Sequence, residues 1–553
     1  MKSLYKIVAV AVLMLFTVQC EVIDSDLLNS PNAVSPENVD PDFLLNNIQL
    51  GARGIYSGAA LRGSQLTRQR RLFGGTYDAA IQSQFMNGVY NTTYSTVFAD
   101  IQTLTPIAED RELYFHLGMA QVFQAYGLLT MVDLFGDMPF SEALDADNFN
   151  PNVDSGADIY AAALNILDEA IDNLQNPDRL SFPASDLYYP GFSGDEKVEA
   201  WVRTANTLKL KAYVNMRHVD PAGSAAAINE LVNDPIGLIV DPSQDFTFDY
   251  STTGTNPDSR HPLFTNNYLN GANDYLGVGF LNVLLNNKED EDPRIRYYIY
   301  RQTTQDTENP AEQSCLAATP PSHYIEGVDP HCQLGDGYWG NGHLNTEGIP
   351  PDQFLRSTFG VYPVGGEFDA NQQQAVNEDM GYQGAGFRPI LMSSFTHFLL
   401  AEAALTLDGV ALDARQLLLD AVDLSISTVV NYGADAAAAL GAEAFEPSEA
   451  RIARYLDEVN QNFDENPIRT IAVEFYIASF PNGMEAYNVM RRTGFPNRMD
   501  GIQAARNSEP GDFYRTLPYA ANLINRNSNV SAKESNLVRT FWDTRGEDTE
   551  FNF

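Results

Sequence analysis

The chain is short of basic residues for its length. Among 553 residues, 34 are Lys or Arg and 73 are Asp or Glu, so the formal net charge is −39. A surface of this sign repels phosphate backbones and anionic lipid headgroups, because both are negatively charged. Binding to nucleic acid is therefore excluded as a function. The chain is 44% hydrophobic and 19% charged, which provides enough apolar residues for a large globular core.

Cysteine is also scarce, with three residues in the whole chain. Cys315 and Cys332 lie in a stretch that also holds His323, His331 and His343. Zinc sites usually present their ligands in closely spaced pairs such as C-x2-C, and this stretch has no such pair. We therefore expect a disulfide between Cys315 and Cys332 in an oxidising compartment, and no metal site.

Long apolar runs are missing beyond the N-terminus. Residues 7–16 are apolar and follow Lys2 and Lys6. The run is too short to span a bilayer and has the length of the hydrophobic part of a signal peptide. We interpret residues 1–19 as a lipoprotein signal peptide and Cys20 as the residue that carries the lipid. An acidic leader over residues 20–40 would follow, with lipid as the only membrane anchor.

Common catalytic motifs are absent. The sequence has no G-x-x-x-x-G-K-[ST] phosphate loop, no G-x-S-x-G nucleophile elbow and no H-E-x-x-H metal helix. We expect no enzyme activity and no cofactor. The four consecutive acids at residues 289–292 lack the alternating spacing of a calcium loop, so we expect a solvated helix end there. Glu402 lies in an apolar helical segment and needs a partner such as Arg.

Helical periodicity is the main pattern that is present. Apolar residues recur about every 3.6 residues, which predicts amphipathic helices. The expected helices cover residues 41–56, 111–135, 158–174, 197–216, 392–407, 412–430, 448–462 and 468–479. Short turns without interleaved strands favour a mainly α fold of stacked, tetratricopeptide-like helix pairs, in one domain over residues 41–553. Residues 254–386 are rich in Gly, Pro, Asn, Tyr and Asp, which indicates a long loop-rich elaboration.

Aromatic residues are abundant, with 27 Tyr and 31 Phe against 3 Trp. Aromatic rings stack on the apolar faces of sugars, while Asn, Asp and Arg bind the hydroxyl groups. We therefore predict glycan contacts by two groups of residues. They are Tyr338, Trp339, Asp336 and Asn341 in a glycine-rich loop, and Tyr77 and Tyr90, with Phe85, Tyr94, Asn87 and Asn91 nearby, after the first helix.

Several motifs follow one another in a characteristic order. They are LLNSPN at residues 27–32, VDLFGDMPFSEA at 132–143, LAEA at 400–403, NVMRRTGFP at 488–496 and LPY at 517–519. In this order they resemble the SusD/RagB family of nutrient-binding outer-membrane lipoproteins. The resemblance implies a tetratricopeptide-like helical fold without catalysis. It also implies a glycan or peptide ligand and a SusC-like TonB-dependent β-barrel transporter as partner, at the extracellular face of the outer membrane.

Three alternatives stay open at the level of sequence. A secreted glycan-active hydrolase would need a pair of carboxylates, and 73 acids supply many candidate pairs. A peptide-binding member of the same family would share the motifs. A periplasmic scaffold of helical repeats would bind only proteins. Ligand binding, product release and cell-surface exposure distinguish these functions.

Overall fold

The computed structural model describes residues 39–145, 147–305, 309–317, 320, 324–327, 329, 331–346, 351–497, 500 and 513–544. The predicted signal peptide, Cys20, all but the last two residues of the acidic leader, and His323 lie outside the described residues. Within the described part of the chain, no helix is long and apolar enough to cross a membrane.

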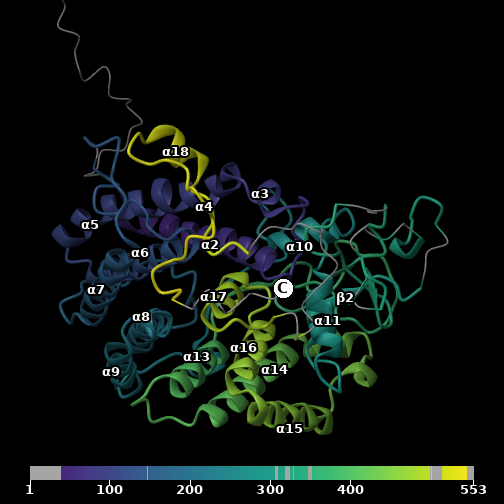
Figure 1. The fold of residues 1–553 in the computed structure, drawn as a ribbon. Coiled ribbons are helices and arrows are strands. Elements are labelled where there is room, and N and C mark those ends of the chain that lie inside the picture. The colour runs from purple at the N-terminus through teal and green to yellow at the C-terminus, as the bar shows by residue number, and fades with distance from the viewer. Residues whose placement is uncertain are drawn as a thin grey trace, which may run out of the picture.

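The first part of the chain folds into helices that pack on their neighbours (Figure 1). Their bounds are α2 Pro41–Leu66, α3 Tyr77–Ala80, α4 Asn87–Asn91, the π-helical turn η4 Thr92–Phe98, α5 Ala99–Asp110, α6 Tyr114–Phe135, α7 Gly156–Gln175, α8 Gly194–Met216 and α9 Pro221–Val232. Asp40 caps α2 by accepting the N–H of Asp42 at 3.0 Å. Helix α6 ends at Gly136, whose φ of 74° most other residues avoid. The pairs α6/α7, α7/α8 and α8/α9 are in contact.

The middle of the chain forms the loop-rich elaboration at the right of Figure 1. Its short elements are α10 Pro262–Tyr268, α11 Val278–Asn286, α12 Ile295–Tyr298, β2 Ile299–Arg301, β3 Gln333–Leu334, β4 Tyr338–Trp339 and β5 Ser357–Phe359. Strands β1 Phe246–Asp249 and β6 Phe387–Leu391 flank it. The strands form three antiparallel pairs, β1–β6, β2–β5 and β3–β4. In β2–β5, for example, Tyr300 lies opposite Thr358. The described strands thus form small two-stranded ribbons.

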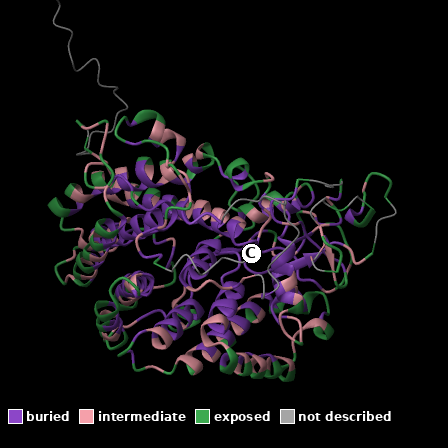
Figure 2. Cartoon of the chain, viewed as in Figure 1, coloured by how far each residue is buried: buried purple, intermediate pink, exposed green. Residues whose placement is uncertain are grey.

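The last part of the chain returns to helices and packs against the first part. The elements are α13 Ser393–Thr406, α14 Ala414–Ala439, α15 Glu449–Glu465, α16 Pro467–Ala478, α17 Gly483–Thr493 and α18 Ala521–Arg526. Helix α13 contacts α14, and α17 contacts α2. The expectation of a mainly helical fold with helix pairs and a loop-rich elaboration is confirmed. Figure 2 shows the buried residues along the middle of the molecule and the exposed residues at its rim.

The acidic run at residues 289–292 differs from its expected solvated state. Asp292 is 2% exposed and its side chain binds Arg294 at 2.7 Å. Asp290 and Glu291 pair with arginines of α15. The prediction of a solvated helix end is therefore wrong for Asp292, because Arg294 pairs with its carboxylate and Tyr455 of α15 donates a hydrogen bond to it at 2.7 Å.

Candidate functional site

Strand β4 carries two of the residues predicted to contact a ligand, Tyr338 and Trp339. Both side chains are 2% exposed. Trp339 packs against the disulfide between Cys315 and Cys332. The guanidinium of Arg301 lies 4.7 Å from the centroid of the Tyr338 ring. Neither ring has a face open to a sugar, so the structure contradicts the predicted stacking role of both residues.

The two polar residues predicted beside them differ in accessibility. Asp336 is exposed, and its backbone carbonyl accepts a hydrogen bond from Arg301 Nη1 at 2.6 Å. Asn341 is 5% exposed, and its backbone forms a bridge with Gly277. The structure thus places Asn341 inside the loop framework, and of these two side chains only that of Asp336 is accessible to a ligand.

Tyr77 and Tyr90 also lie mostly inside the protein. Tyr77 is 3% exposed, stacks on Tyr514 at a centroid distance of 5.3 Å, and forms a 3.0 Å hydrogen bond with His343. Tyr90 is half-buried against Tyr94, with ring centroids 4.7 Å apart. Tyr77 therefore supports the loop after α2, and Tyr90 offers only part of its ring to a ligand.

An accessible cluster of aromatic and arginine residues lies beside the loop that Tyr77 supports. We call it the Tyr275 patch, and it consists of Arg71, Phe73, Tyr275, Asp352, Phe354 and Arg356. The backbone N–H of Arg71 donates to the carbonyl of Tyr275 at 3.0 Å, and Arg71 Nη2 donates to the carbonyl of Asn345 at 3.0 Å. These bonds join the segment after α2 to the loop-rich elaboration.

Two guanidinium groups stack against the Tyr275 ring. The Arg356 guanidinium carbon lies 3.7 Å from the ring centroid, and that of Arg71 lies 5.0 Å from it. Asp352 accepts hydrogen bonds from the Tyr275 hydroxyl and from Arg356 Nε. Burial and the neighbouring Asp352 raise the pKa of Tyr275, so its hydroxyl keeps its proton. Burial lowers the pKa of Arg71 to about 10, so Arg71 stays charged at neutral pH.

The outer surface of the patch is aromatic. Phe73 is 56% exposed and lies 4.4 Å from the Arg71 guanidinium carbon, while Phe354 is 41% exposed. Gln353, which precedes Phe354 in the chain, is hydrogen-bonded to Asn273 at 3.2 Å, and the backbone carbonyl of Asn273 accepts a hydrogen bond from Arg356 Nη1 at 3.1 Å. Exposed rings can stack on the apolar C–H face of a sugar, and planar guanidinium groups beside them can donate hydrogen bonds to the hydroxyl groups at its edge.

The sequence analysis missed the residues of this patch. A usable signal was present, because Arg68, Arg70 and Arg71 form a basic run in a chain that has few basic residues, and Phe73 and two glycines follow it. The pairing of this run with Tyr275 was not accessible from sequence, since more than 200 positions separate them.

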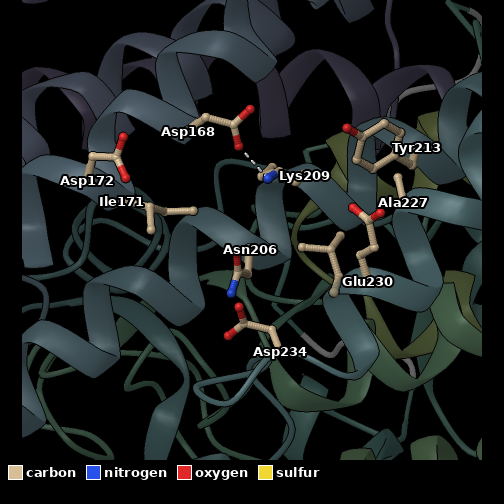
Figure 3. A pocket seen from close by; sticks show the side chains of 10 residues that line it. Asp168, Ile171, Asp172, Asn206, Lys209, Tyr213, Ala227, Glu230 and Asp234 are labelled. Atoms are coloured by element: carbon tan, nitrogen blue, oxygen red, sulfur yellow. Dashed lines mark hydrogen bonds and ion pairs between the residues drawn. The ribbon is translucent and has the colours of Figure 1, made fainter.

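A second candidate is a polar hollow of about 280 Å³ between α7, α8 and α9. Figure 3 shows Lys209 paired with Asp168, and Asp172, Glu230 and Asp234 around the same space. The hollow is acidic, and Tyr213 is its one aromatic lining residue. Within the part of the chain that the structure describes, no group of three or more His, Cys, Asp or Glu is placed to hold a metal ion.

Two family descriptions together match most of the chain. Residues 31–315 match the SusD-like family described as "Starch-binding associating with outer membrane". Residues 370–547 match the family described as "Susd and RagB outer membrane lipoprotein". A search of curated proteins gives no match.

Solved structures share the fold at low sequence identity. A SusD/RagB family protein from Bacteroides thetaiotaomicron is 17% identical, with a TM-score of 0.64, and the match covers 92% of this chain and 100% of that one. A SusD homologue from Bacteroides fragilis is 18% identical, with a TM-score of 0.61 and coverages of 92% and 100%. A chitin-binding SusD homologue from Flavobacterium johnsoniae is 16% identical, with a TM-score of 0.58 and coverages of 91% and 98%.

The helical scaffold and the matches over nearly its full length define the class as SusD-like proteins. The chain belongs to the SusD/RagB family of outer-membrane lipoproteins. The family membership that its motifs indicated is therefore confirmed.

Proposed function

We propose that this protein binds oligosaccharides or polysaccharides at the cell surface and delivers them to a TonB-dependent β-barrel transporter. The observation that carries the proposal is the Tyr275 patch, where exposed Phe73 lies beside Arg71, and Arg71 and Arg356 stack against Tyr275. Family membership and the chitin-binding homologue from Flavobacterium johnsoniae support a glycan as the ligand class. Binding rather than hydrolysis is proposed, because the patch engages its carboxylate, Asp352, with Tyr275 and Arg356.

The geometry suggests how a sugar is held. Phe73 and Phe354 offer exposed rings for the apolar face of a pyranose. Arg71 underlies the Phe73 ring and is held from behind by Tyr275, so its position is set before a ligand arrives. A site that is ordered in advance loses less conformational entropy on binding. Arg71 is the donor that we expect to contact sugar hydroxyls. The side-chain carbonyl of Gln353 can serve as an acceptor, because its NH2 group already donates to Asn270 and Asn273.

The first test is a binding screen with starch, chitin and plant-polysaccharide oligosaccharides, followed by Phe73→Ala. We expect the variant to weaken binding of the best glycan by about tenfold, since stacking and ring burial are lost. Phe43→Ala is the matched control, because Phe43 is 73% exposed on α2, outside the patch. Unchanged affinity in Phe73→Ala would remove the patch from the site, and no binding across the panel would remove the glycan function.

Further experiments test the transporter partner and the alternative functions. Purification of the tagged lipoprotein from detergent-solubilised membranes should recover a large β-barrel protein. Protease added to intact cells should cleave a surface protein and spare a periplasmic scaffold. Release of sugar products from a bound glycan would instead indicate a hydrolase, and selective binding from a peptide library would indicate a peptide-binding member.

A further inference from the structure

A second group of arginine, tyrosine and histidine side chains lies around Tyr250 and shares no residue with the Tyr275 patch. We call it the Tyr250 cluster, and it consists of Arg53 and Tyr56 of α2, Tyr250 after β1, His261 before α10, and Arg388 of β6. Arg388 is 6% exposed, Tyr56 is 2% exposed and His261 is fully buried, while Arg53 and Tyr250 are half-buried. The cluster therefore has a buried floor and a surface-facing side.

Arg388 differs from six other buried arginines in the partners of its guanidinium group. Its guanidinium carbon lies 5.7 Å from the Tyr56 ring centroid and 5.6 Å from that of Tyr250, and its Nε donates to the Tyr250 hydroxyl at 3.2 Å. No carboxylate pairs with it among the residues that the structure describes. Six other buried arginines each pair with an acid, namely Arg217, Arg260, Arg294, Arg301, Arg492 and Arg515.

Arg53 adds a second charge of the same kind. Its guanidinium carbon lies 5.4 Å from the Phe248 ring centroid and 6.0 Å from that of Tyr250. Within the described residues, its guanidinium has neither a carboxylate nor a hydrogen-bond partner. Two positive groups thus lie against one tyrosine ring in a protein whose net charge is −39.

Two neutral members of the cluster, His261 and Tyr56, are hydrogen-bond donors that have no acceptor among the described residues. His261 Nδ1 accepts the N–H of Leu263 at 3.2 Å, which leaves the ring proton on Nε2, and this buried nitrogen has no hydrogen-bond partner. Burial, and then the nearby Arg388 and Arg53, hold the pKa of His261 well below its usual value, so the ring is neutral. The buried hydroxyl of Tyr56 also has no hydrogen-bond partner within the described ranges of the chain.

A buried charge without a partner is expensive, and so is a buried donor without an acceptor. A bound oxyanion would reduce both energetic costs. It would pair with the charge and accept the hydrogen bonds, because guanidinium groups bind carboxylate and sulfate oxygens through paired, charge-assisted hydrogen bonds. We propose that the Tyr250 cluster is a binding site for an oxyanion, a carboxylate or a sulfate group, held by Arg388 and Arg53. The anion is either a free inorganic ion or the acid group of a larger ligand such as a uronic acid.

The test measures the melting temperature of the mature protein at constant ionic strength with sodium sulfate, sodium galacturonate or neutral galactose. A saturable rise with sulfate, with galacturonate or with both is expected, since a ligand that binds only the folded state stabilises it. A larger rise with galacturonate identifies a sugar acid, and a larger rise with sulfate identifies a sulfate-type anion. No saturable rise with either anion, or the same rise with galactose, overturns the proposal.

Arginine variants test whether the anion binds at the Tyr250 cluster. Arg53→Gln, at a half-buried position, should weaken binding of the anion roughly tenfold, the usual effect of losing a charged hydrogen bond. Arg454→Gln removes the same charge from an arginine of α15 that is 62% exposed and should leave binding unchanged. Equal binding by wild type and Arg53→Gln overturns the assignment to this cluster.

A second measurement separates ligand binding from a structural role of Arg388. In buffer free of oxyanions, Arg388→Met should raise the melting temperature or leave it unchanged, because it removes an uncompensated charge. Arg217→Met is the matched comparison and should lower the melting temperature, because it removes one of two partners of buried Glu402. If Arg388→Met lowers the melting temperature as much as Arg217→Met does, Arg388 is a structural residue and the proposal is overturned.

Discussion

At the residue scale, buried charge in the helical core is paired. Glu402 is fully buried in α13 and lies 2.8 Å from Arg217 Nη2 and 2.9 Å from Arg492 Nε. Burial acts to raise the pKa of Glu402, but Arg217 and Arg492 hold it below its usual value of 4.5. Because the pKa is lower in the folded state, this stabilisation is present above about pH 4.5 and is lost as the pH falls further. The predicted arginine partner of Glu402 is thus confirmed.

Glu402→Ala should lower the free energy of unfolding by about 3–5 kcal/mol, since it leaves two guanidinium groups buried without their acid. Urea denaturation followed by circular dichroism measures the loss. Asp464→Ala is the control, because the pair of Asp464 with Arg415 is solvent-exposed and should contribute at most about 1 kcal/mol. Equal losses in the two variants would show that the buried cluster is no stronger than a surface pair.

At the element scale, helix α2 near the start of the chain packs against helix α17 near its end. Helices α2 and α17 cross where Gly63 meets Gly483, and a Cβ on Gly63 would lie 2.1 Å from the Gly483 carbonyl oxygen. The contact joins residues more than 400 positions apart in sequence. Glycine is needed at this crossing because the neighbouring atom is backbone and cannot move aside as a flexible side chain could.

Gly63→Ala should destabilise the protein by about 3 kcal/mol, at the upper end of the usual range for overpacking. The melting temperature and the urea midpoint both report the effect. Gly88→Ala, in α4, is the matched control, because a Cβ there meets no atom within 4 Å. Alanine favours a helix over glycine by up to about 1 kcal/mol, so this control should be neutral or slightly stabilising. A neutral Gly63→Ala would show that the two helices separate without loss.

At the scale of the whole molecule, the acidic surface and the predicted lipid anchor would act together. A net charge of −39 keeps the folded body away from anionic lipid headgroups. A lipid on Cys20 would then be the membrane anchor, with the leader as the tether that precedes α2 at Pro41. The Tyr275 patch and the Tyr250 cluster would be presented on a body held near the membrane but not embedded in it.

Cys20→Ala should abolish incorporation of radiolabelled palmitate and move the protein from the membrane fraction to the soluble fraction. The reason is that the cysteine thiol carries the acyl chains, so the anchor is lost while the folded body is unchanged. Ser25→Ala, in the same leader, is the control and should stay labelled and membrane-bound. Retention of Cys20→Ala in membranes would point to an anchor other than lipid.

Much of the helical framework could be predicted from sequence. The expected helices at residues 158–174 and 197–216 correspond to α7 and α8 within a few residues, because their apolar stripes face the core. Helix α5 was missed, and it contains Pro106 in its interior, which ordinarily signals a break. Helix α9 was missed too, since its small residues, Ala and Gly among them, make a weak pattern.

The candidate site was less predictable than the scaffold. Composition alone favoured Trp339 as a ligand contact, yet the Cys315–Cys332 disulfide and the neighbouring loops bury it. Phe73 follows a basic run, but nothing in the local sequence reports that its side chain is 56% exposed. Exposure depends on which distant segments cover a residue, and a single sequence does not report that.

The sequence by itself determined the helical class, the order of family motifs, the scarcity of basic residues and the need of Glu402 for a partner. These follow from local periodicity, composition and the cost of burying one charge, none of which depends on long-range contacts. Only the tertiary structure decided which aromatic rings face solvent, that Arg71 meets Tyr275, and that no acid in the described part of the chain pairs with Arg388. Those facts arise where distant segments pack together, and packing sets both the exposure of a ring and the partners of a charge.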